Sequence, residues 1–91
     1  MSHRKFRIEL NGVTDRAGFV DAVNRGLVRQ VGGRWDGGDW DALRDFLSWP
    51  QETSYALELA GWAACPALAA PERARFEDIL RSNPHVVVVR C

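Results

Sequence analysis

The sequence predicts a small α/β domain of two layers, a three-stranded parallel β-sheet with three to four helices. Two observations predict this class. Segments with the periodicity of strands alternate with segments with the periodicity of helices, so successive strands are joined by right-handed crossovers and run parallel. The last strand is a continuous run of valines, which is typical of parallel sheets. The length of 91 residues fits a single domain spanning 1–91.

The first half of the chain contains one predicted strand and two predicted helices. Phe6–Leu10 alternates apolar and charged side chains, as a half-buried strand does. Thr14 is a candidate N-cap for a helix whose apolar stripe reaches Leu27. After a glycine-rich loop, Asp39 is a good N-cap for a second helix over Trp40–Ser48.

The second half is predicted to contain two more strands and a third helix. Ser54–Leu59 has the pattern of a strand, whereas residues 60–70 are small and irregular and allow one short helical turn at most. Pro71 suits the first turn of a helix, which Asn83-Pro84 ends. Val86–Val89 is then expected to be a strand covered on both faces or paired centrally in the sheet.

Charge is balanced over the whole chain but not along it. Twelve Lys and Arg residues offset twelve Asp and Glu residues, which excludes an overall field that would steer the protein onto nucleic acid or a membrane. Four acidic residues nevertheless lie between positions 36 and 45, with one positive charge among them. These are Asp36, Asp39, Asp41 and Asp45, interrupted by Arg44. The sequence therefore predicts a neutral protein with an acidic patch.

Cysteine and histidine usage predicts a reduced, cytoplasmic protein without metal or cofactor. Cys65 and Cys91 show no CxxC spacing, and with His3 and His85 they show no spacing of metal ligands. The basic N-terminus lacks the apolar stretch of a signal peptide, and the most apolar window, 55–70, is too interrupted to span a bilayer.

The acidic patch is centred on the predicted helix Trp40–Ser48. Asp41 and Asp45 lie one turn apart on the face opposite the apolar residues, where like charges destabilise a helix by a few tenths of a kcal/mol. Only Asp41, in the first turn, gains from the helix dipole. The pattern alone leaves two interpretations open, a solvated polar face and a binding surface.

The segment from Trp35 to Leu47 resembles the signature of the barstar family, intracellular inhibitors of microbial ribonucleases. The resemblance rests on the loop glycine Gly37 and on Asp-Ala-Leu-x-Asp at positions 41–45, which leads a helix. A strand ending at Asn11-Gly12 and a strand containing Leu57-Glu58 lie at the expected distances on either side. The resemblance covers nearly the whole chain, and the order of elements derived above is also that of the family.

The resemblance implies roles for individual residues. Asp45 would be the central anchor, entering the nuclease site where a substrate phosphate binds, and Asp41 would flank it. Trp35 would occupy the place of an aromatic residue that packs over the catalytic cleft. Asp78 would supply a second acidic contact, with Glu77 as the alternative. The predicted partner-binding residues are therefore Trp35, Asp36, Gly37, Asp39, Asp41, Arg44, Asp45 and Asp78.

Two departures from the family pattern bear on the partner. Asp39 replaces a usual Asn, and Arg44 stands where an interface tryptophan is common. The predicted partner is a basic extracellular-type ribonuclease or a related nuclease toxin, and the free protein is expected to be a monomer. The alternatives are an immunity protein for a different nuclease toxin and a non-inhibitory interaction module that uses the same acidic face.

The residues also raise two alternatives to inhibition, an enzyme and a nucleic-acid-binding protein. Asp41 and Asp45 could approximate the carboxyl pair of a retaining glycosidase, but exposed carboxylates on a small domain lack a cleft and a raised pKa. We therefore predict that the chain is not an enzyme. Arginines and tryptophans suit single-stranded nucleic acid, but acidic residues match the arginines in number, so no direct nucleic-acid binding is expected.

Overall fold

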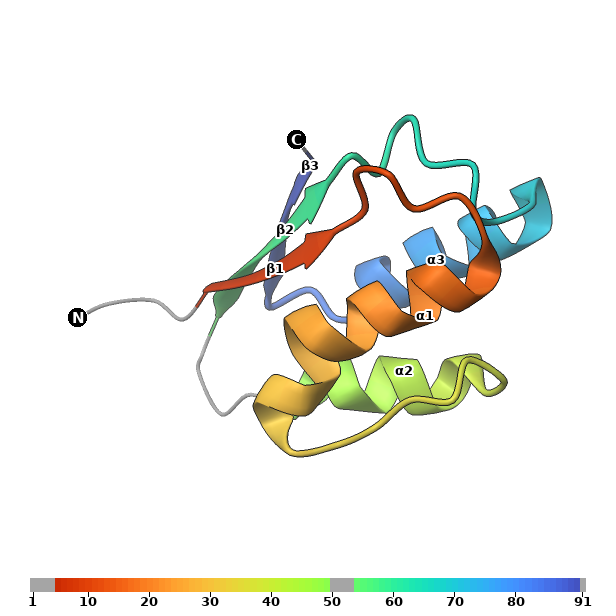
Figure 1. The fold of residues 1–91 in the computed structure, drawn as a ribbon. Coiled ribbons are helices and arrows are strands. Elements are labelled where there is room, and N and C mark those ends of the chain that lie inside the picture. The colour runs from red at the N-terminus through yellow and green to blue at the C-terminus, as the bar shows by residue number, and fades with distance from the viewer. Residues whose placement is uncertain (1–4, 50–53, 91) are drawn as a thin grey trace.

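A computed structural model describes residues 5–49 and 54–90. Its elements follow one another as a strand, a long interrupted helix, a second helix, a strand, a third helix and a strand (Figure 1). Their bounds are β1 (Lys5–Glu9), α1 (Arg16–Val23) continued by a π-helical turn (Asn24–Val28) and a 3-10 turn (Arg29–Val31), α2 (Trp40–Ser48), β2 (Tyr55–Ala60), α3 (Ala70–Arg81) and β3 (Val86–Arg90). The predicted strand bounds differ from these by one residue.

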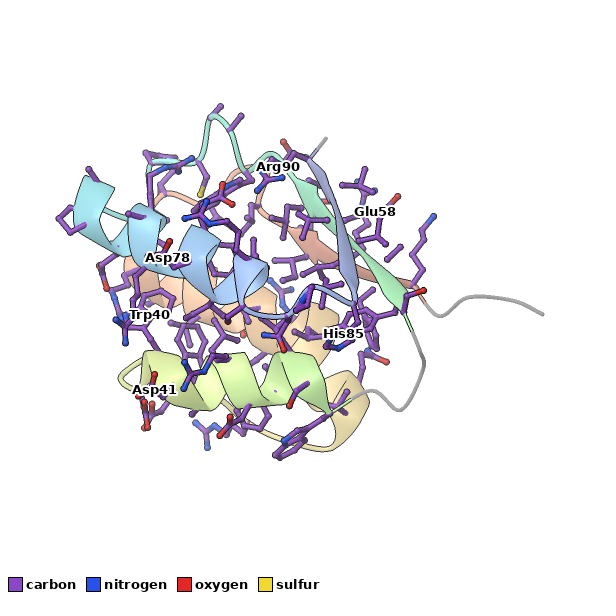
Figure 2. All side chains as sticks on the ribbon, turned by 180° about the vertical axis from the view of Figure 1, so that it is seen from behind. Trp40, Asp41, Glu58, Asp78, His85 and Arg90 are labelled. Carbon is purple, nitrogen blue, oxygen red and sulfur yellow. The ribbon has the colours of Figure 1, made fainter. Side chains whose placement is uncertain are left out.

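The three strands form a parallel sheet in the order β1-β2-β3, which confirms the predicted fold class. In β1 the side chains of Phe6 and Ile8 are buried under the helices, while the alternate, charged side chains face solvent. All three helices cover the same face of the sheet (Figure 1). On the uncovered face, Glu58 of the central strand pairs with Arg7 at 3.3 Å and with Lys5 at 3.4 Å (Figure 2).

The strand β3 differs from its prediction. Among the described residues it pairs with β2 alone and therefore lies at the edge of the sheet, and the described helices cover one of its faces. Val86 is buried, whereas Val87 is 55% exposed and Val89 is also largely exposed. The prediction of a central or doubly covered strand is wrong because a run of valines reports β-propensity but not how many layers cover the sheet.

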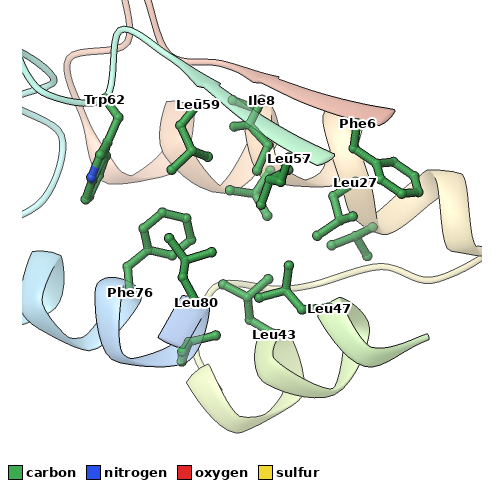
Figure 3. Packing of buried hydrophobic residues seen from close by; sticks show 14 of the residues in the cluster. Phe6, Ile8, Leu27, Leu43, Leu47, Leu57, Leu59, Trp62, Phe76 and Leu80 are labelled. Atoms are coloured by element: carbon green, nitrogen blue, oxygen red, sulfur yellow. The ribbon is translucent and has the colours of Figure 1, made fainter. Parts of the chain in front are cut away.

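The core lies between the sheet and the three helices (Figure 3). The sheet contributes buried side chains from β1 and β2, such as Ile8 and Leu57, and the helices contribute Leu43, Leu80 and their neighbours. Phe19 of α1 lies in an aromatic cluster, and its ring meets that of Phe76 edge to face at 5.3 Å. Large aromatic side chains suit so small a domain because each buries much apolar area.

The first helix begins one residue later than predicted and lies unusually close to the sheet. Asp15, rather than Thr14, is its N-cap, because the Asp15 carboxylate accepts a hydrogen bond from Gly18 N at 2.8 Å. At Gly26, a Cβ atom would lie 2.2 Å from the carbonyl oxygen of Arg7 in β1. A glycine is therefore required at this position, although glycine weakens a helix.

The segment between β2 and α3 has no helix, and Arg73 of α3 holds it. The Arg73 guanidinium donates to the carbonyl oxygens of Trp62 at 3.0 Å and Cys65 at 2.7 Å, and it lies 3.9 Å from the Trp62 ring centre. Cys65 is a buried free thiol. Cys91 and His3 lie outside the described residues. Within residues 5–49 and 54–90, no helix has the length and apolarity that crossing a membrane requires.

Candidate functional site

The helix α2 presents its charged residues to solvent because its apolar stripe is fixed in the core. Asp39 caps the helix as predicted: its Oδ1 accepts from the backbone N–H of Asp41 at 3.0 Å and of Ala42 at 3.4 Å. Burial of Leu43 and of two neighbouring apolar residues orients the helix. Asp45 and the other charged residues of α2 consequently lie on its exposed face.

Asp45 lies near the middle of that exposed face. Its backbone carbonyl accepts a hydrogen bond from Ser48 Oγ at 2.6 Å. Among the residues that the structure describes, none forms an ion pair or hydrogen bond with the Asp45 carboxylate. The carboxylate therefore faces solvent from a rigid element.

Asp41 differs from Asp45 because two arginines accompany it. Its Oδ1 lies 3.6 Å from Arg44 Nη2 on the same helix and 3.5 Å from Arg75 Nη2 on α3. The structure thus does not present Asp41 and Asp45 as two equivalent carboxylates. Arg75 could not be assigned to this site from the sequence, since only the packing of α3 beside α2 brings it there.

The loop before α2 is held in shape by its own side chains. Asp36 Oδ1 accepts from Gly38 N at 2.8 Å, which closes a tight turn. Gly37 has a φ of +87°, and a Cβ atom there would lie 2.6 Å from Val20 Cγ2 of α1. Only glycine tolerates both the positive φ and the close contact with Val20. The predicted loop glycine therefore has a structural role in placing Asp36.

Arg16 of α1 ties the same loop to two helices. Its guanidinium donates to the carbonyl oxygen of Gly37 and, at 2.8 Å, to Glu72 Oε2 at the start of α3. It also lies 5.7 Å from the centre of the Trp40 ring at the start of α2. The loop and the N-terminal end of α2 are therefore fixed relative to the rest of the domain.

Trp35 lies in the core rather than on the surface. Its side chain is 2% exposed, its Nε1 donates to the carbonyl oxygen of Asp39 at 2.8 Å, and its ring lies 5.2 Å from that of Trp40. The expectation that this ring packs over a partner's cleft is thus not met in this structure. The physical reason is that the loop folds back onto α1, where the large apolar ring is better buried. Trp35 supports the loop from inside.

Of the two alternatives on α3, the geometry favours Asp78. Asp78 is 65% exposed, pairs with Arg81, and lines the same depression as Asp41. Glu77 is 27% exposed and points toward the sheet, where it accepts from Trp62 Nε1 at 3.2 Å and from Arg90.

Two open depressions flank the exposed face of α2. One, of about 230 Å³, lies between α2 and α3, and the other, of about 420 Å³, lies against the loop. The first is lined by Asp41, Arg44, Arg75, Asp78, Ile79 and Ser82, and the second by Arg34, Trp35, Asp36, Asp39 and Ala42. The described part of the chain contains no group of three metal-ligating side chains. Open, charged depressions suit contact with a macromolecular surface better than enclosure of a small ligand.

The fold and the site define a class, a small α/β domain with a charged surface helix beside a rigidly held loop. Comparison with models of protein families matches residues 3–85 to the family described as Barstar (barnase inhibitor). The match covers nearly the whole chain, and the chain belongs to the Barstar family, which confirms the resemblance. No curated protein and no solved structure gave a match.

Three residues that shape the site were not predicted. Arg16 and Arg75 are partly exposed arginines, and their positions along the sequence indicate only a solvated helix face. The residue type at position 24 is a weak indication of its role, because asparagine is unfavourable within a helix unless its side chain bonds to backbone. In the structure it does so, holding the backbone of Trp35.

Proposed function

We propose that this chain is an intracellular, immunity-type inhibitor of a ribonuclease, acting in the cytoplasm. In this proposal the exposed face of α2 and the loop before it enter the nuclease active site. Membership of a family described by inhibition of a ribonuclease supports the proposal. The observation that carries it is the Asp45 carboxylate, exposed on a rigid helix and without a partner among the described residues.

A ribonuclease binds the phosphates of its substrate with cationic side chains. A carboxylate that enters such a site replaces a phosphate oxygen pair and accepts charge-assisted hydrogen bonds, which are stronger than neutral ones. The bond from Arg16 to the loop and the capping bond of Asp39 hold the loop and the start of α2 in place before binding. Less conformational entropy is then lost on association.

The substitution Asp45→Ala tests the proposal. Inhibition should weaken by about 2 kcal/mol or more, because the cations of the nuclease site would lose their partner. The thermal midpoint should stay equal or rise slightly, since Asp45 lies mid-helix one turn from Asp41. The control is Glu9→Ala, an exposed carboxylate of β1 that pairs with Arg7 at 3.2 Å. Undiminished inhibition by Asp45→Ala would remove α2 as the binding site.

One observation favours a second candidate, an immunity protein for a different nuclease toxin. Arg44 and Arg75 place two cations next to Asp41 on the proposed binding face. A basic ribonuclease site would repel both. A toxin whose active-site rim carries mixed charge would fit this face better, and measuring inhibition of ribonuclease and deoxyribonuclease toxins side by side distinguishes the two candidates.

A further inference from the structure

The exposed face of α2, taken with the residues on either side of it, has two halves of different charge. We call the half beside the preceding loop the loop half, and the half beside α3 the α3 half. In a helix with about 100° per residue, Ala42 and Arg44 lie on opposite flanks of the exposed face, with Asp45 between them. Ala42 borders the depression beside the loop, whereas Arg44 borders the groove beside α3. The loop half carries Asp36, Asp39 and Asp45, with Arg34 and Arg29 at its edge, so acidic residues are in excess there.

The α3 half has an excess of positive charge. Its charged groups are three arginines, Arg44, Arg75 and Arg81, and two aspartates, Asp41 and Asp78. Because Arg81 pairs with Asp78, the remaining excess of positive charge falls on Arg44 and Arg75, which share a single aspartate.

The two arginines that share Asp41 are poorly satisfied by it. Both contact the same oxygen, at 3.5 and 3.6 Å, whereas charge-assisted N–H···O bonds are about 2.7–2.9 Å long. Each guanidinium has five N–H donors. Among the described residues, neither arginine has another ion pair, and both side chains are more than half exposed. Most of their donors therefore face the groove and solvent.

We infer that the partner carries an acidic side chain that docks in the α2–α3 groove between Arg44 and Arg75, beside the cationic site that receives Asp45. This inference rests on the proposed function and adds the charge pattern of the nuclease. The groove of about 230 Å³, with Ile79 in its lining, has room for the end of an aspartate or glutamate. A uniformly basic cleft on the nuclease would attract the loop half but repel the α3 half.

A single carboxylate suits the groove better than an RNA phosphate does. An RNA strand carries a charge at every nucleotide, so a strand bound at Arg75 would continue toward Asp45 and the acidic loop half. A protein carboxylate ends in the groove, and its neighbours on the nuclease surface are free to be cationic.

The inference is tested by inhibition assays against barnase and a panel of other purified microbial ribonucleases. For the ribonuclease that the unmodified chain inhibits most tightly, Arg44→Gln and Arg75→Gln should each weaken inhibition about tenfold, because the partner's carboxylate would lose a cation. Arg25→Gln, in an exposed pair that does not line the groove, should change nothing. Thermal midpoints of these variants should match that of the unmodified chain, since exposed ion pairs contribute little stability.

A double-mutant cycle then locates the acid. Each Asp or Glu around the active site of that ribonuclease is replaced by its amide, and one replacement should abolish the effect of Arg75→Gln. Asp45→Asn reports separately on the proposed function and should weaken inhibition in every case. If it does so while Arg44→Gln and Arg75→Gln inhibit equally well or better, the inference is overturned and the proposed function stands.

Three further outcomes would also overturn the inference. Full inhibition by Asp45→Asn would remove α2 as the binding site, and a chain that inhibits no ribonuclease of the panel would overturn the proposed function; either result overturns the inference. Binding of a fluorescent RNA oligonucleotide to the unmodified chain, lost in Arg75→Gln, would assign the groove to phosphate instead of a protein carboxylate.

Discussion

The side-chain amide of Asn24 binds both backbone polar groups of Trp35. Asn24 Oδ1 accepts from Trp35 N at 2.7 Å, and Asn24 Nδ2 donates to Trp35 O at 2.7 Å. The same Nδ2 donates to Val20 O at 2.9 Å, so one buried amide joins the first helix to the loop before α2. The bonds are shielded from water, which makes the loop backbone dependent on this one side chain.

We predict that Asn24→Ala destabilises the protein by about 2–3 kcal/mol, because it leaves the buried N–H and C=O of Trp35 without partners. The thermal midpoint, measured by circular dichroism, should fall by roughly 10 °C or more in a domain of this size. The control Asn11→Ala removes an exposed amide that bonds to Glu9 and should shift the midpoint much less. Equal shifts in the two variants would contradict the role assigned to Asn24.

The close approach of the first helix to β1 gives a second prediction. Gly26→Ala should destabilise the protein by about 1–3 kcal/mol, since the new methyl group would lie 2.2 Å from Arg7 O and force the helix away. Helix propensity alone predicts that the same substitution stabilises the protein by about 1 kcal/mol. Gly38→Ala, where the nearest atom is 3.4 Å away, is the matched control. Urea unfolding separates the two expectations by the sign of the change in the free energy of unfolding caused by Gly26→Ala.

A third prediction concerns acid stability. Burial raises the pKa of Glu77, but the hydrogen bonds from Arg90 and Trp62 and the charge of Arg90 outweigh it, so its pKa lies below the usual value. A lowered pKa stabilises the fold at neutral pH, and this contribution is lost as the pH falls through the folded-state pKa. Glu77→Gln should therefore cost about 0.5–1 kcal/mol at neutral pH.

The difference between the unmodified protein and Glu77→Gln should shrink as the pH is lowered below the ordinary pKa of glutamate. Denaturant unfolding at a series of pH values measures this difference. Asp78→Asn, on the neighbouring exposed residue, should have a smaller effect at neutral pH. A pH-independent cost of Glu77→Gln would show that the side chain acts through packing rather than through its charge.

The fourth prediction concerns the rate of complex formation. Because the acidic loop half of α2 would meet a cationic nuclease site, the association rate constant should fall as the salt concentration rises, while the dissociation rate constant changes less. Stopped-flow mixing with an inhibited ribonuclease at several salt concentrations measures both. An association rate that salt does not affect would count against the acidic residues as the contact surface.

Much of the candidate site could be predicted because its features are local. Asp39 directly precedes the helical segment, which predicts its role as a cap, and the exposed face of α2 follows from helical periodicity within nine residues. The surroundings of those residues could not be predicted in this way. Arg75 reaches Asp41 only through the packing of α3 against α2, and no pattern along the chain connects the two.

The sequence by itself determined the order of elements, the parallel sheet and the family, because periodicity, caps and a short motif are readable within a few residues. Only the tertiary structure decided how these elements cover one another. It buried the ring of Trp35, exposed Val87 on the uncovered face of the sheet, and placed two arginines beside Asp41. These outcomes depend on which surfaces meet across the fold, and local patterns record the type of an element but not its neighbours in space.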